Sequence, residues 1–157
     1  MLISASKPAD IEIIASPTLK STKELVTYRE GKRPPGGLPR RDDIVAYEIP
    51  HLLSNLMIAE PIDGGADWIY RLVGTAIVAR SGRDTTGMRM RQIFPPEVAD
   101  VYIGDYRRGV ENRAPWFARG YFVLPGTEHV QFESVGLPIL GRDGATVWLL
   151  LGVFYLN

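Results

Sequence analysis

ATVWLLLGVFYL, residues 145–156, has an apolar side chain at every position from Val147 to Leu156 except Gly152. The segment follows the turn sequence GRDG of residues 141–144, and we therefore predict that it is the second strand of a hairpin. A strand in a sheet with one solvated face carries apolar residues on one side only, whereas both alternating sets are apolar here. We expect both faces of this sheet to be covered, one by helices and the other by an N-terminal helix, a second subunit or both.

The segments upstream extend this pattern into an α+β fold. Residues 116–124 and 128–140 read as two more strands, joined by the turn signal Pro-Gly-Thr at 125–127. Residues 95–113 predict the longest helix, which is preceded by short helical turns. Residues 56–62 and 67–73 predict a hairpin around the glycines of residues 63–66. This order predicts a five-stranded antiparallel sheet with helices on one face.

The N-terminal region predicts an extension of the domain. Residues 11–14 alternate weakly and are compatible with a short strand. Ser16 and Pro17 suit the N-cap and first residue of a helix that ends near Gly31. Residues 38–43, LPRRDD, are a charged linker, either a solvated loop or an ordered strap that pairs its charges with the domain. We predict an extension over residues 1–43 and a domain over residues 44–157.

Composition and charge exclude several classes of protein. The 157-residue chain has 18 basic and 18 acidic residues, so no net charge draws it toward nucleic acid or an anionic membrane. It has no cysteine, which excludes disulfides, thiol nucleophiles and thiolate metal sites. No apolar run reaches the roughly 20 residues of a membrane span, and the N-terminus does not resemble a signal peptide. We expect a cytoplasmic protein without membrane contact.

No motif in the sequence specifies a reaction or a cofactor. Nucleotide-binding glycine patterns and a recognisable Ser–His–Asp set are absent. Helix 95–113 has no histidine for haem, and we expect His51 and His129 at the surface. We therefore predict no metal, no cofactor and no catalytic residue, although Glu133 and Asp105 are one conceivable acid–base pair.

Several motifs resemble the PAS domain superfamily. Pro138, Gly144 and Gly152 match its C-terminal hairpin pattern, and the runs YRLVGT at 70–75, GRDTTG at 82–87 and LPRRDDI at 38–44 are similar to a group of short, stand-alone bacterial PAS-like proteins of unassigned activity. The resemblance covers roughly residues 17–156. It implies a five-stranded antiparallel sheet with helices on one face, enclosing a cavity, in a module that senses small molecules or dimerises. Since 157 residues leave no room for a kinase, cyclase or DNA-binding output, we expect a partner protein to supply it.

We expect a mostly apolar ligand pocket at this sheet. Residues of the strands and the long helix with aromatic, hydroxyl or guanidinium groups are the candidates, with plain core packing or surface salt bridges as the alternative. The candidates are Tyr70, Arg71, Tyr102, Tyr106, Arg119, Phe132, Ser134, Trp148 and Phe154. We assign the other set of the last strand to a homodimer interface, because large apolar patches tend to be interfaces: Leu149, Leu151, Val153 and Tyr155.

Three functional hypotheses follow. The first is a sensory or regulatory module that binds a small organic molecule non-covalently or relays the state of a partner protein. The second is a structural homodimerisation module with a self-filled core. The third is a small enzyme with an acid–base residue in the cavity, which we disfavour because no catalytic set is recognisable.

Overall fold

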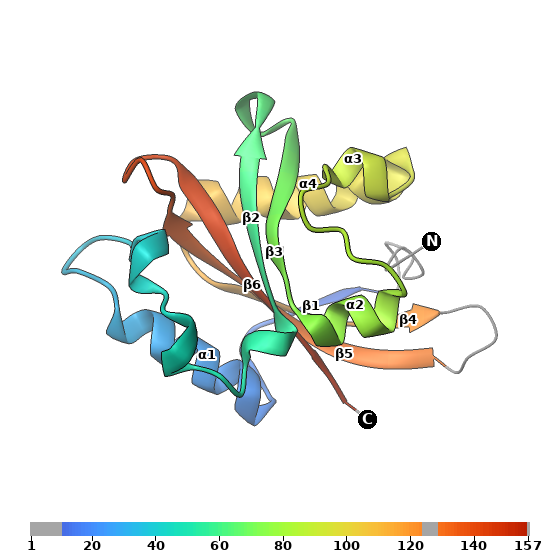
Figure 1. The fold of residues 1–157 in the computed structure, drawn as a ribbon, viewed down its shortest axis with the longest axis horizontal. Helices are drawn as coiled ribbons and strands as arrows, with labels where there is room; N and C mark the ends of the chain where they lie inside the picture. The colour runs from blue at the N-terminus through green and yellow to red at the C-terminus, as the bar shows by residue number, and fades with distance from the viewer. Residues whose placement is uncertain (1–10, 124–128, 157) are drawn as a thin grey trace.

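The computed structural model of the chain describes residues 11–123 and 129–156. An antiparallel sheet of six strands, in the order β1-β4-β5-β6-β2-β3, carries helices on both of its faces (Figure 1). The strands are β1 (Glu12–Ile14), β2 (Leu56–Ile62), β3 (Asp67–Val73), β4 (Trp116–Val123), β5 (His129–Leu140) and β6 (Val147–Tyr155). The α+β class is confirmed, with six strands rather than five. The added strand β1 lies at the sheet edge beside β4, where weak alternation had suggested a strand but the strand count had left it out.

The helical elements are α1 (Lys20–Gly31), the 3₁₀ turns η3 (Arg41–Asp43), η4 (Ala46–Glu48), η5 (Leu53–Asn55) and η6 (Asp63–Gly65), and the helices α2 (Thr75–Ser81), α3 (Met90–Ile93) and α4 (Pro96–Asn112). Helix α1 and the segment that follows it pack on one face of the sheet, and α2, α3 and α4 pack on the other. Among the described residues, none of these helices is long and apolar enough to cross a bilayer. The predicted turn at residues 125–127 lies outside the described residues.

Two hydrophobic clusters lie on opposite faces of the sheet. One joins α2, α3 and α4 to the face that carries Tyr70, Leu149 and Leu151. The other joins Leu25 of α1 and residues of the following loop to the face that carries Leu150. In Figure 1, α1 in blue lies apart from α2, α3 and α4 in green to yellow. The prediction that both faces are covered is confirmed, and α1 covers the second face.

Helix α1 begins later than its local sequence predicts. The expected N-cap Ser16 and first residue Pro17 lie outside the helix, which starts at Lys20 without a side-chain cap from its own segment. The cap comes instead from Glu133 in the middle of β5. This carboxylate accepts the backbone N–H groups of Thr18, at 2.9 Å, and Leu19, at 3.1 Å, and the Thr18 hydroxyl. A contact between residues more than a hundred positions apart has no signal in local capping rules.

The segment 38–43 is an ordered strap. Leu38 is buried, the N–H of Leu140 donates to the carbonyl oxygen of Pro39 at 2.8 Å, and Arg142 forms an ion pair with Asp42 at 3.0 Å. Of the two interpretations of LPRRDD, the ordered one is therefore confirmed.

Candidate functional site

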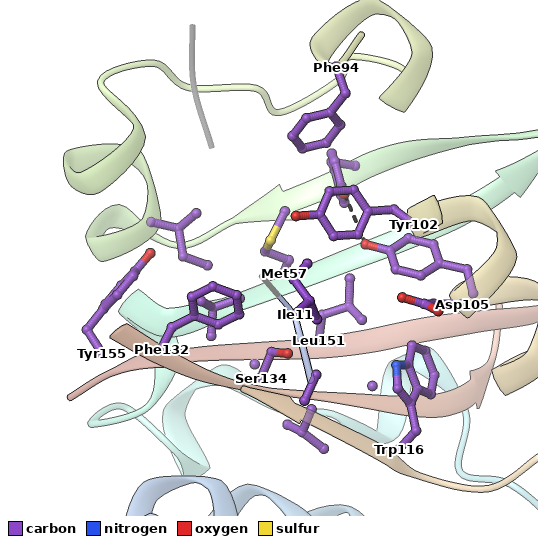
Figure 2. A pocket seen from close by; sticks show the side chains of 18 residues that line it. Ile11, Met57, Phe94, Tyr102, Asp105, Trp116, Phe132, Ser134, Leu151 and Tyr155 are labelled. Carbon is purple, nitrogen blue, oxygen red and sulfur yellow. Dashed lines mark hydrogen bonds between the residues drawn. The ribbon is translucent and has the colours of Figure 1, made fainter. Parts of the chain in front are cut away.

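A cavity of about 100 Å³ lies between α4 and the sheet, bounded mostly by apolar side chains. Its walls come from β2, α2, α4 and the strands β4 to β6. Figure 2 shows Tyr102 and Asp105 extending from the helix toward the strands that carry Ser134 and Leu151. The apolar lining includes Met57, Ile77, Phe94, Trp116, Phe132, Leu151 and Val153, and the polar lining is Tyr70, Tyr102, Asp105, Tyr106, Ser134 and Tyr155.

Two glycines create the slot that holds the Trp116 indole at one end of the cavity. A Cβ atom at Gly109 of α4 or at Gly136 of β5 would lie 2.2 Å from this ring. The indole ring fits only because both positions lack a side chain. Trp116 therefore packs directly between the backbone of α4 and the backbone of β5. The strand pattern predicted close packing or room for a ligand at Gly136, on the face with Phe132 and Ser134, whereas nothing in the sequence indicated Gly109.

A hydrogen-bonded pair of buried tyrosines, one from β3 and one from α4, forms part of the cavity wall. The hydroxyls of Tyr70 and Tyr106 lie 3.0 Å apart, and Tyr106 packs edge-on against Trp68 with 5.1 Å between ring centroids. Burial raises the pKa of Tyr70 to about 12 and raises the pKa of Tyr106 well above its ordinary value. Both rings therefore stay neutral and serve as hydrogen-bonding groups.

This pair predicts a measurable coupling free energy. We expect Tyr106→Phe to lower the free energy of unfolding by about 1 kcal/mol, because the buried Tyr70 hydroxyl loses its partner. Adding Tyr70→Phe should cost much less than Tyr70→Phe alone, since no unpaired hydroxyl is left. Urea unfolding of the two single variants and the double variant measures the coupling, and strictly additive losses would contradict the pair.

Tyr102 and Ser134 bring unused hydroxyls to the cavity. Neither side-chain hydroxyl has a hydrogen-bond partner within the ranges that the structure describes, 11–123 and 129–156. The Tyr102 ring packs on Phe94 with 5.1 Å between centroids, and burial raises the pKa of Tyr102. Both side chains are partly buried, and neither oxygen is fully enclosed, so each hydroxyl is accessible to a polar atom of a guest molecule.

Asp105 supplies the acidic group of the cavity wall. Its side chain is 15% exposed and forms an ion pair with Arg108. Burial raises the pKa of Asp105, while the Arg108 guanidinium opposes that rise. The carboxylate is thus a hydrogen-bond acceptor at the edge of an apolar space. Asp105 was predicted to lie on the long helix but not among the ligand contacts, because spacing alone does not show which residue of a helical turn faces a cavity.

The structure brings five of the nine predicted ligand residues together at this cavity: Tyr70, Tyr102, Tyr106, Phe132 and Ser134. Trp148 and Phe154 lie on the other face, in the cluster with α1, so their predicted placement was wrong. The cause is the register of the β5–β6 hairpin. Leu140 pairs with Val147, so even-numbered residues of β5 lie opposite odd-numbered residues of β6.

The same register overturns the predicted interface set. Leu149 and Leu151 pack against the helices, and Leu151, Val153 and Tyr155 line the cavity. These side chains face inward and do not form an outer surface of a monomer.

Both predicted arginines lie away from the cavity. Arg71 occupies the position where β2 and β3 shift register, and its side chain, 49% exposed, pairs with Glu60 at 2.6 Å. The irregularity also turns Leu72 to the α1 face, although strict alternation had placed it with Trp68 and Tyr70. Arg119 pairs in register with Glu133 and contacts the Thr18 hydroxyl at 3.3 Å, so it belongs to the α1 side.

The suggested acid–base pair is not assembled, because Asp105 borders the cavity while Glu133 caps α1 on the opposite face. Within residues 11–123 and 129–156 there is no group of three His, Asp or Glu side chains suited to a metal ion. His51 lies at the surface, as predicted, with its Nε2 atom 2.6 Å from Glu24, and the side chain of His129 lies outside the described residues.

Comparison with known proteins agrees with this architecture. The family model described as a PAS domain matches residues 18–154, which include α1, strands β2 to β5 and most of β6 and of the cavity lining. A comparison with curated proteins found no match. Because the family match covers most of the sequence, the chain belongs to the PAS domain family, whose members are sensory and regulatory modules.

Proposed function

We propose that this PAS domain binds a small, largely apolar organic molecule in the cavity and passes its occupancy to α1. The observation that carries the proposal is the pair of unused hydroxyls, Tyr102 and Ser134, that face an apolar space together with the half-buried Asp105 carboxylate. Ligand sites are mostly apolar with a few aimed polar groups, and this cavity has that character.

The size of the cavity sets the class of ligand. An apolar protein cavity of about 150 Å³ accommodates benzene. A volume of about 100 Å³ therefore suits a molecule smaller than benzene that carries one polar group. This polar group would exchange hydrogen bonds with the Tyr102 and Ser134 hydroxyls, or donate to Asp105. A haem or a flavin would require the helix and the sheet to separate.

Strand β5 supplies the path to α1. Ser134 points into the cavity, while the preceding residue, Glu133, caps α1 on the other face. A ligand that shifts this part of β5 changes the geometry of the α1 cap, and a ligand that binds one arrangement more tightly shifts the population toward it. The state of α1 is then available to a partner protein.

Filling the cavity tests the proposal. We expect Ser134→Leu to abolish ligand uptake, because the larger side chain occupies the cavity and removes a hydrogen-bonding group. Native mass spectrometry of the purified wild-type protein should show an added mass of a small organic molecule, absent from the Ser134→Leu spectrum. Ser134→Ala is the matched control, since it removes only the hydroxyl; it should keep the volume and weaken uptake by roughly tenfold.

Two results would contradict ligand sensing. One is a wild-type protein that shows no added mass and no change in melting temperature with any molecule of a library of small organic compounds. The other is equal uptake by the wild type and by Ser134→Leu. The same spectra report the oligomeric mass, which tests the homodimer expected from the sequence.

The competing functions have less support from the geometry. The dimerisation hypothesis rested on an apolar outer set that faces the cavity and the helices instead. The cavity-enzyme hypothesis retains Asp105 but lacks a second acid–base group beside it among the described residues. Ligand sensing is therefore the function that we favour.

A further inference from the structure

A second concave surface lies away from the cavity, where the strap meets the β5–β6 hairpin and the β2–β3 pair. We call it the arginine groove; it has a volume of about 520 Å³ and is lined by Arg41, Arg71 and Arg142, with Glu60, Asp143 and Trp148. Arg41 belongs to the LPRRDD strap, a motif that the cavity does not involve. The groove thus joins segments that are separated by about a hundred residues in the sequence but lie side by side in the fold.

The carboxylates around the groove are already engaged. Glu60 pairs with Arg71 at 2.6 Å, and Asp42 pairs with Arg142 at 3.0 Å. Asp143 accepts the Thr146 hydroxyl at 2.6 Å and the backbone N–H groups of Ala145 and Thr146 at 2.9 and 2.8 Å. These hydrogen bonds lower the pKa of Asp143 to about 2. The ionised carboxylate is thus already bonded to groups of the hairpin turn.

Arg41 is the cation of the groove without an acidic partner. It forms no ion pair with any residue in the described part of the chain, and its side chain donates one hydrogen bond, at 3.3 Å, to the carbonyl oxygen of Ile44. Burial and the like charge of Arg142 lower the pKa of Arg41, and the nearby Asp42 carboxylate opposes this only in part. A half-buried guanidinium near a second one is unfavourable unless an anion compensates them.

We propose that the arginine groove binds a small phosphorylated molecule, with Arg41 as the principal contact and Arg142 as the second. The planar guanidinium fork holds phosphate oxygens through paired hydrogen bonds, which makes arginine the suited residue for this chemistry. Arg71 and Arg142 at the rim are 49% and 65% exposed, and each would exchange its present carboxylate partner, Glu60 or Asp42, for an incoming anion. This site is distinct from the cavity and does not depend on the proposed ligand there.

Calorimetric titration with inorganic phosphate against chloride at matched ionic strength tests the site. We expect saturable binding by the wild type, and roughly tenfold or greater weakening in Arg41→Gln, because a charge-assisted contact is lost. Arg107→Gln is the matched control, since Arg107 is exposed on α4 away from the groove; it should bind phosphate within twofold of the wild type. Arg142→Gln, in an exposed turn, should also weaken binding and serves if Arg41→Gln fails to fold.

Stability distinguishes a binding arginine from a structural one. Without phosphate, Arg41→Gln should keep or raise the melting temperature, because it removes a like charge next to Arg142; with phosphate, only the wild type and Arg107→Gln should gain. A parallel titration with acetate separates phosphate from carboxylate recognition, and acetate binding as tight as phosphate would overturn the assignment of the ligand class. Undetectable phosphate binding, or equal affinity in the wild type and Arg41→Gln, would overturn the site.

Discussion

Gly74→Ala is expected to lower the free energy of unfolding by about 3 kcal/mol or more, although it adds a single methyl group. The added Cβ would lie 2.3 Å from the carbonyl oxygen of Ser54 and 2.7 Å from that of Leu53. Both atoms belong to the backbone of η5, which cannot rotate away as a side chain can, so the contact exceeds ordinary overpacking. Gly74 has φ −65° and ψ 152°, which alanine adopts readily, so the loss arises from the close approach alone.

Thermal unfolding measures this effect against a matched substitution. For a chain of this size, about 3 kcal/mol corresponds to a melting temperature lowered by roughly 6–12 °C. Gly31→Ala is the control, because a Cβ at Gly31 would meet nothing within 4 Å. It lies in the last turn of α1, where alanine is favoured over glycine by up to about 1 kcal/mol. If the two variants had equal melting temperatures, the proposed contact between Gly74 and η5 would be wrong.

Glu133→Ala is expected to release the N-terminal end of α1 from the sheet, at a loss of about 3 kcal/mol in the free energy of unfolding. The side chain is fully buried, and its carboxylate accepts hydrogen bonds from Thr18 and Leu19. Each charge-assisted hydrogen bond contributes roughly 1.5–3 kcal/mol, and the donors would be left without their acceptor. Hydrogen exchange should show the largest loss of protection in the first turns of α1, while α4 stays protected.

Glu111→Ala and Glu133→Gln complete this experiment. Glu111 is exposed on α4, so its replacement should change the stability by less than about 0.5 kcal/mol. Glu133→Gln keeps an acceptor oxygen and should recover part of the loss. Uniform loss of protection throughout Glu133→Ala would show that the carboxylate stabilises the whole fold rather than α1 in particular.

The same carboxylate gives a pH dependence with a defined sign. Burial opposes ionisation of Glu133, but the hydrogen bonds from Thr18 and Leu19 outweigh it and lower the pKa below its ordinary value of 4.5. The contribution of the charge to stability is therefore complete well above pH 4.5 and is lost as the pH falls through the lowered pKa. The stability advantage of the wild type over Glu133→Gln should shrink on acidification.

Much of the fold was predictable because its signals are local. Alternating apolar residues, glycine-rich turns and the proline at the start of α4 gave the order of strands and helices. The apolar character of both sets in β6 correctly indicated two covered faces. Five residues of the cavity followed from the same patterns, since an aromatic or hydroxyl group on a strand or a long helix is visible in the sequence.

The errors arose where a contact between distant segments sets the answer. The register of the β5–β6 hairpin exchanged the two faces of β6, because a shift of one residue turns every side chain of a strand to the other side. The irregularity at Arg71 did the same for Leu72 in β3. The cap of α1 by Glu133 and the partnerless Arg41 depend on segments that meet only in the folded protein.

The contact between Glu133 and Thr18, 115 residues apart, also constrains how the protein reaches this state during translation. A ribosome releases the segment of α1 early, when the acceptor for its first N–H groups has not yet been made. The isolated segment is too short to be a stable helix in water. We therefore expect it to leave the ribosome without a fixed conformation and to dock only after β5, which carries Glu133, has emerged.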